Sequence, residues 1–128
     1  MTKEASCSRE ALNCLMHDAS EAYLVDIPRP LKAVPHFGAR YKTMEEQIML
    51  VAAQKFGFDM PTEEVHLLDQ RLLNTEQRDL MPPEANTLGP WFPEAGVLKR
   101  RIVPWSPSKA ELEFLGAWQR LRKYRDKS

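Results

Sequence analysis

A histidine and an aspartate stand side by side at His17 and Asp18, within the stretch MHDASEAYLVDIPRPLK. An imidazole and a carboxylate together suit a first-row divalent metal ion. The spacing of apolar residues predicts a helix over 9–25, on which neighbouring side chains diverge by about 100°. Both groups could therefore reach one ion only if it sat between them, on the flank of that helix. A half-exposed polar pair without a metal is the alternative interpretation.

A second carboxylate, Asp69, lies among the apolar residues of another predicted helix, over 63–80. Burying a carboxylate is costly unless it is paired or bound to a metal. Two helices would then direct ligands toward the same interior. The alternative for Asp69 is an ion pair with an arginine of its own helix, Arg71 or Arg78.

Two more acids and two cations follow the His-Asp pair. Glu21 stands one helical turn after His17 and could orient it or hold a water, or it could be a solvated helix acid. Asp26 precedes the Pro-Arg-Pro segment and could act as a general acid or base, or it could be a turn residue. Arg29 and Lys32 could clamp a phosphate, with two solvated cations as the alternative.

The two remaining histidines carry weaker signals. His66 stands three residues before Asp69, a spacing that could share a metal ion, but a surface histidine near the start of a helix is more common. His36 lies in a predicted loop over 33–41 without a visible partner.

The composition bounds the class of protein. The 128 residues suit one compact domain, over 1–128. Lysine plus arginine and aspartate plus glutamate number 18 each, so the net charge is zero, which argues against a nucleic-acid binder driven by bulk charge. No apolar run could span a membrane, and the first residues lack a signal-peptide core. Cys7 and Cys14 form no CxxC motif, so we expect free thiols in a reducing cytoplasm.

No segment alternates with a period of two, so the expected class is all-α, with about four main helices. The expected helices are 9–25, ended by Pro28 and Pro30; 44–56, with a Thr43–Glu46 capping box and a terminal Gly57; 63–80, between Thr62 and Pro82; and a last helix from near Pro107. Residues 82–107 read as an irregular strap or lid, rich in proline and tryptophan, which its aromatic side chains pack down.

Three stretches of the chain resemble the HD-domain phosphohydrolases, in the branch of bacterial 5′-deoxynucleotidases and small phage-encoded HD hydrolases. LMHDASEAYLVDIPRPLK is similar to the central motif of that branch. LLDQRLLNTEQRDLM is similar to the later helix with the final metal-binding aspartate, and RIVPWSPSKAELEFLGAWQRL to the C-terminal helix with its Pro-Trp lead-in. The resemblance covers nearly the whole chain.

This resemblance implies a single HD-like helical bundle that binds a divalent ion (Mn, Co, Mg, Fe or Zn) through His17, Asp18 and Asp69. Glu21 would position the attacking water, and Asp26 would serve as an acid or base. The implied activity is hydrolysis of a phosphoester or phosphoanhydride of a nucleotide or deoxynucleotide.

One ligand of the family pattern has no counterpart. The family's first metal ligand is a histidine on an upstream helix, and none of the 16 residues before His17 is a histidine. We therefore expect an N-terminally truncated bundle with weaker metal binding, impaired activity and an exposed apolar groove, which could favour a homodimer. The alternative function is a non-catalytic HD module that binds a nucleotide or a protein partner. Arg29 and Lys32 match basic positions of the family loop, and their assignment to phosphate is our inference.

Overall fold

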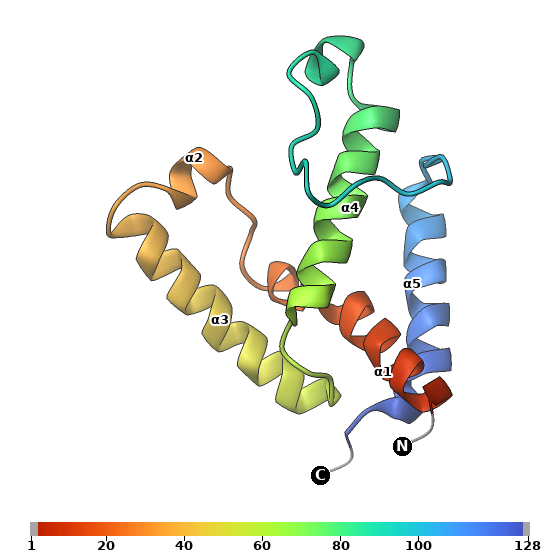
Figure 1. Ribbon diagram of the computed structural model, residues 1–128. Helices are drawn as coiled ribbons and strands as arrows, with labels where there is room; N and C mark the ends of the chain where they lie inside the picture. The colour runs from red at the N-terminus through yellow and green to blue at the C-terminus, as the bar shows by residue number, and fades with distance from the viewer. Residues whose placement is uncertain (1–2, 127–128) are drawn as a thin grey trace. The chain divides into compact units, whose positions relative to one another are not determined.

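The computed structural model describes residues 3–126, with no side chains described before residue 7, and this part of the chain is all-helical, as predicted (Figure 1). It contains no strand, and none of its helices is long and apolar enough to cross a membrane. The α-helices are α1 (Lys3–Met16), α2 (Arg29–Lys32), α3 (Phe37–Phe56), α4 (Glu63–Leu80) and α5 (Pro107–Leu121). Short 3-10 helices are η1 (Ala19–Ala22), η2 (Pro83–Asn86) and η3 (Arg122–Tyr124).

The chain divides into two compact units. The first comprises Met1–Met60 and Phe114–Ser128, and the second comprises Pro61–Glu113. Helix α5 therefore begins in the second unit and ends in the first. The expectation of a single domain over 1–128 stays a prediction.

An apolar core holds the first unit together. Its buried side chains come from α1, α3 and the residue that follows the turn after α3: Leu12, Met16, Met49, Ala52, Ala53 and Phe58. Trp118 and Leu121 of α5 pack against this core, and the rings of Phe56 and Trp118 meet edge to face with 5.8 Å between their centroids. Burial of these apolar faces is the main stabilising contribution in this unit.

The first helix ends before the His-Asp pair, so its predicted extent over 9–25 was wrong. Helix α1 ends at Met16, and Asp18 has φ −107° and ψ 22°, outside the α-helical region. The Glu21 amide donates to the Asp18 carbonyl at 2.9 Å, which starts η1. The His-Asp pair thus lies in a turn between two helices, and the geometry expected for neighbours on a helix does not apply.

The segment after this turn is more helical than predicted. Pro28 and Pro30 do not end a helix but introduce α2, because proline needs no donor in a first helical turn. Helix α3 begins at Phe37 and not at 44, so Thr43 is inside the helix, where its hydroxyl donates to the Ala39 carbonyl at 3.0 Å. The Thr43–Glu46 capping box was therefore wrong. Gly57 ends α3 with φ 72°, as predicted.

Helix α4 has the predicted bounds. Thr62 caps it by accepting a hydrogen bond from the Val65 amide at 3.3 Å, and the chain leaves it just before Pro82. Apolar spacing predicts an inner stripe of Val65, Leu68, Leu72 and Leu80 on this helix, and its buried face differs from that stripe. Val65 is buried, but Leu68, Leu72 and Leu80 are exposed, and the other buried side chains are polar: Asn74, Thr75 and Gln77.

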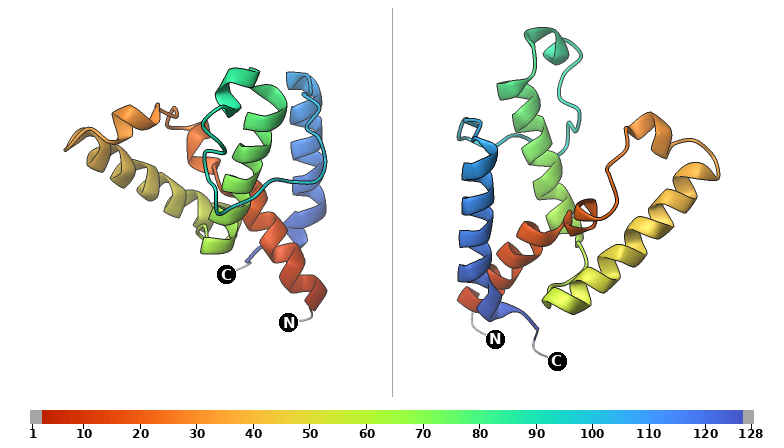
Figure 2. Two further views of the ribbon diagram at one scale, coloured as in Figure 1. Left: turned by 45° about the horizontal axis from the view of Figure 1, so that its top comes forward. Right: turned by 180° about the vertical axis from the view of Figure 1, so that it is seen from behind.

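These polar side chains hold residues 82–107, which we call the strap, against α4. Figure 2 shows the strap running back alongside that helix in both views. The Asn74 amide nitrogen donates to the carbonyls of Phe92 and Gly96, and its oxygen accepts from the Phe92 amide at 2.9 Å. Gln77 repeats this pattern with the carbonyls of Ala85 and Gly89 and the amide of Trp91. The strap is packed down as expected, but through hydrogen bonds, and its two tryptophans stay about half exposed.

Candidate metal centre

A main-chain carbonyl in the last turn of α1, that of Cys14, orients the imidazole of His17. Its Nδ1 lies 2.7 Å from the carbonyl oxygen of Cys14. A carbonyl oxygen only accepts hydrogen bonds, so Nδ1 carries a proton and donates it. In the neutral ring, Nε2 then carries the lone pair. This is the arrangement that fixes metal-binding histidines, in which the outer nitrogen donates to a carbonyl or carboxylate and the inner nitrogen binds the ion.

The Nε2 atom of His17 faces a carboxylate. It lies 3.0 Å from Oδ2 of Asp18, and it is buried although the side chain as a whole is 23% exposed. A lone pair and a carboxylate oxygen at this distance repel one another unless a proton or a cation lies between them. The pair therefore fits a divalent ion, and an imidazolium paired with Asp18 satisfies the same geometry. The Asp18 side chain is 59% exposed, which leaves it open to a ligand.

Glu21 lies in the same acidic neighbourhood. Partial burial raises the pKa of its carboxyl group above the ordinary value, and the charges of Asp18 and Asp26 raise it further, against the opposing charge of Lys32. A carboxylate with a raised pKa accepts protons more readily. The position in η1, one short turn after the His-Asp pair, thus suits a base that holds a water.

Asp26 and Lys32 form an ion pair. The Lys32 ammonium lies 2.7 Å from Oδ1 of Asp26, which also accepts from the Ile27 amide at 2.9 Å. The hydrogen bond from Lys32 lowers the pKa of the Asp26 carboxyl and raises that of the lysine. Asp26 is therefore ionised near neutral pH, which suits a base or a charge-holding group more than an acid. Sequence reasoning gave these two residues separate roles, and the structure joins them.

Helix α3 holds the Asp26–Lys32 segment in place. The Tyr41 hydroxyl donates to the Val25 carbonyl at 2.7 Å, and the Lys32 ammonium lies 5.6 Å from the centre of the Tyr41 ring. Gly38 permits the close approach of α2, because a Cβ there would lie 1.8 Å from the Lys32 carbonyl oxygen. Sequence reasoning missed Tyr41 and Gly38, and it missed the Cys14 carbonyl, since a main-chain acceptor has no signature in the sequence.

The other two predicted site residues lie on helices α2 and α4. Arg29 is the first residue of α2 and is exposed. Asp69 belongs to the second unit, in the middle of α4, and is partly buried; burial and the charge of Asp69 raise the pKa of Glu76. Arg71 and Arg78, its alternative partners, each donate to strap carbonyls, and Arg78 also pairs with Asp79.

The two other histidines lie at helix starts. His66 is exposed in the first turn of α4. His36 precedes α3 with φ 65°, the single non-glycine residue with a positive φ among residues 3–126.

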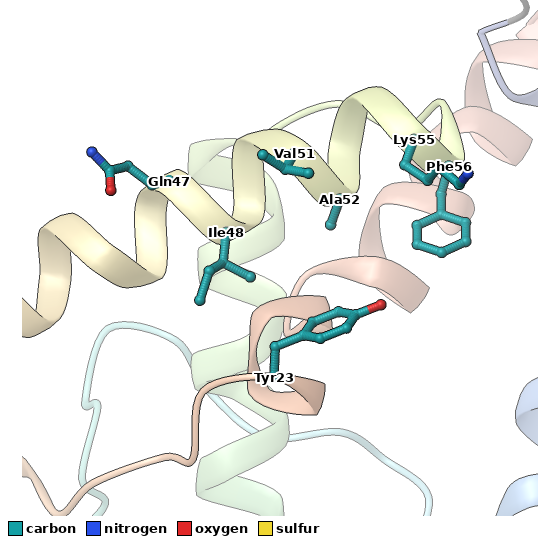
Figure 3. Close-up of a pocket in the computed structure, with 7 residues that line it drawn as sticks. All are labelled: Tyr23, Gln47, Ile48, Val51, Ala52, Lys55 and Phe56. Atoms are coloured by element: carbon teal, nitrogen blue, oxygen red, sulfur yellow. The ribbon is translucent and has the colours of Figure 1, made fainter.

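An open apolar groove lies beside η1 in the first unit. Figure 3 shows Tyr23, which follows η1, across from Ile48 of α3. The groove has a volume of about 480 Å³, and its other lining residues are Gln47, Val51, Ala52, Lys55 and Phe56. Its walls are apolar except for the polar ends of a few side chains.

Part of the chain matches a known bacterial protein. A protein of Escherichia coli (strain K12), described as uncharacterized protein YfdR, is 45% identical over 71 residues, which are 55% of this chain and 38% of the relative. The matched part thus spans well under half of that relative. No family model and no solved structure matches the chain. The relative's description gives no activity, so an assignment of function depends on the site.

Proposed function

We propose that the protein is a metal-dependent phosphohydrolase of the HD type that acts on a phosphoester of a nucleotide or deoxynucleotide. The observation that carries the proposal is the imidazole of His17, whose Nδ1 is held by the Cys14 carbonyl while Nε2 faces Asp18 at 3.0 Å. The resemblance to HD phosphohydrolases, which spans both the His-Asp pair and the helix with Asp69, supports the same reading.

His17, Asp18 and Asp69 would hold the ion. One nitrogen and two carboxylate ligands suit Mn, Co, Mg, Fe or Zn, and the chain does not select among these metals. A divalent ion, when bound, polarises a phosphoryl oxygen and lowers the pKa of a coordinated water. Asp69 is included among these ligands because of the resemblance and because it is a partly buried carboxylate of α4.

The residues around the His-Asp pair have separate roles in the proposed reaction. Glu21, with its raised pKa, accepts a proton from the attacking water. Asp26 stays ionised and holds the Lys32 ammonium in an ion pair. This pair fixes the charge of the loop that contacts the substrate. Arg29 contacts a phosphate oxygen through its guanidinium fork. The two free cysteines of the described chain, Cys7 and Cys14, fit a reducing cytoplasm as the compartment.

A phosphate-release assay tests the proposal. The full chain is incubated with each of the common nucleotides and deoxynucleotides, as mono- and triphosphates, with Mn²⁺, Co²⁺ or Mg²⁺. We expect turnover with at least one pair of substrate and metal, and a loss of at least about 100-fold in His17→Ala and Asp69→Asn, as for the removal of a group that acts directly in the transition state.

His66→Ala is the matched control, since His66 is an exposed histidine on α4. It should keep the wild-type rate. Turnover that survives in His17→Ala would contradict the proposal, and so would the absence of turnover with every metal. Tight binding of a nucleotide without turnover would favour the non-catalytic HD module instead.

A further inference from the structure

Three consecutive cations lie exposed on the strap of the second unit. They are Lys99, Arg100 and Arg101. A run of surface cations is ordinarily flexible, and ordering it on a ligand costs conformational entropy. The feature that sets this run apart is the way in which its backbone is held.

Helix α4 holds the backbone at both ends of this run and at Arg100. The Leu98 amide donates to the Thr75 hydroxyl at 2.9 Å, and the Ile102 amide donates to the Asp79 carboxylate at 2.9 Å. Arg78 donates to the carbonyls of Leu98 and Arg100 at 3.0 and 3.1 Å.

The group that anchors this end of the strap is buried. The Asp79 side chain is 2% exposed and binds Arg78 through both carboxylate oxygens, at 2.7 and 2.9 Å. Hydrogen bonds that involve such charged groups are stronger than neutral ones. The fold thus uses a buried carboxylate and its ion pair with Arg78 to present a cationic segment of backbone that is already ordered, which reduces the entropic cost of binding an anion.

An aromatic ring accompanies the cations. Trp105 is 53% exposed, and the ammonium of Lys109 lies 5.2 Å from the centre of its ring. Cations that bind phosphates together with an exposed ring on which a base can stack are the two elements of single-stranded nucleic-acid binding. A double-stranded ligand would leave the ring unused, because its bases are already stacked on one another.

We propose that residues 99–105 of the strap form a binding surface for single-stranded nucleic acid, with Lys99, Arg100 and Arg101 on the phosphates and Trp105 against a base. The zero net charge of the chain agrees with this proposal, because binding then depends on a local cationic surface and not on bulk charge. The proposal does not depend on phosphohydrolase activity.

Fluorescence anisotropy with a labelled 20-nucleotide oligo(dT) tests the proposal on the full chain. We expect binding that weakens with added salt. The triple variant K99Q/R100Q/R101Q should bind at least about tenfold more weakly, and its dependence of log affinity on log salt should be shallower by about 2, for three lost phosphate contacts on a single strand.

The C-terminal cations supply the matched control. R122Q/K123Q/R125Q removes the same charge from residues of and next to η3, and it should retain wild-type affinity. Equal loss in both triple variants would overturn the proposal, since binding would then follow total charge. A second pair of variants separates the aromatic contribution: Trp105→Ala should lose about tenfold in affinity and Trp91→Ala, also half exposed, should lose none.

Two further outcomes would overturn the proposal. If vesicles of phosphatidylcholine and phosphatidylserine (7:3) bind the chain through the same cations while oligo(dT) does not, the surface is a membrane contact and the proposal is wrong. Absence of binding to oligo(dT) at low salt, with the circular dichroism spectrum of a folded chain, overturns it as well.

Discussion

At the scale of residues, the site depends on atoms that sequence motifs do not show. The His-Asp pair is easily found, but the proton on Nδ1 of His17 is set by a main-chain carbonyl, that of Cys14. Similarly, the ion pair of Asp26 and Lys32 keeps its place because Gly38 has no side chain where α2 crosses α3. The geometry of the candidate site therefore follows from close main-chain contacts as much as from its side chains.

Replacing either of two helical glycines by alanine should change the stability of the fold, in opposite directions at the two positions. In Gly38→Ala the new Cβ would lie 1.8 Å from the Lys32 carbonyl oxygen, so α2 must move, at a cost of about 1–3 kcal/mol. In Gly116→Ala of α5, the nearest atom is the flexible end of Arg120 at 3.4 Å, so the gain in helix propensity of about 0.5–1 kcal/mol should prevail. Urea denaturation followed by circular dichroism measures both, and a stabilised Gly38→Ala would contradict the close approach.

At the scale of elements, α4 is bound to the strap by a row of polar side chains. Buried amides that bind main-chain groups on both sides are costly to remove, because truncation leaves those groups without partners. The strap should therefore be fixed by single residues of α4 more than by its own tryptophans.

Cleavage by trypsin measures how firmly α4 holds the strap, since the strap carries the cleavable residues 99–101. In Asn74→Ala the carbonyls of Phe92 and Gly96 lose their donor, and cleavage in the strap should be about tenfold faster than in the wild type, in proportion to the larger open population. Leu88→Ala, a side chain almost fully exposed on the same strap, is the control and should be cleaved at the wild-type rate. Equal rates in all three proteins would show that the amide does not hold the strap.

A second contact between elements gives a dependence on pH. Arg9 of α1 binds the Asp59 carboxylate at 2.7 and 3.0 Å, and Asn13 donates to the same group at 3.0 Å. The hydrogen bond from Arg9 lowers the pKa of Asp59 below its ordinary value of 3.8, so the unfolded chain takes up the proton first as the pH falls. The contribution to stability is thus present above about pH 4 and is lost below it.

Asp59→Asn should therefore lower the stability at pH 7 by at most about 1 kcal/mol, because the pair is partly exposed and screened. The difference from the wild type should shrink towards pH 3. Urea midpoints at pH 7, 5 and 3 measure it, and a difference that grows as the pH falls would contradict the assigned sign.

At the scale of the whole molecule, the two units are stabilised in different ways. The first has an apolar core around Leu12, whereas the second has buried amides, a hydroxyl and an ion pair that hold the strap on α4. Mutations should therefore act through lost packing in the first unit and through unsatisfied polar groups in the second.

Leu12→Ala tests the apolar core, since this side chain is fully buried in the first unit. It should lower the free energy of unfolding by about 2–5 kcal/mol through the cavity that it leaves. Val51→Ala, in the open groove of the same unit, should change it by less than about 0.5 kcal/mol. Similar losses in both variants, measured by urea denaturation, would mean that the groove is covered in solution.

The fold could be predicted where signals are local. Helix α4 was found to the residue because Thr62 and Pro82 delimit it, and Gly57 gave the end of α3. The first helix was mispredicted because apolar spacing continues past Met16, while the chain turns there to form contacts around His17 that spacing does not encode. The polar inner face of α4 was missed for the same kind of reason, since Asn74 and Gln77 have partners far along the chain.

The candidate site, too, could be predicted from the sequence only in part. The residue types at His17, Asp18 and Glu21 could be read from the sequence, whereas the pairing of Asp26 with Lys32 needed the position of α2. The role of Asp69 stays a prediction from the resemblance.

Titration of Mn²⁺ into the full chain by calorimetry tests the central claim most directly, that His17, Asp18 and Asp69 share one divalent ion. We predict one site per chain, lost in His17→Ala, in Asp18→Asn and in Asp69→Asn, and retained in Cys14→Ser, because residue 14 acts through its main-chain carbonyl. Retention of the site in Asp69→Asn, or no heat of binding in the wild-type chain, would contradict the account.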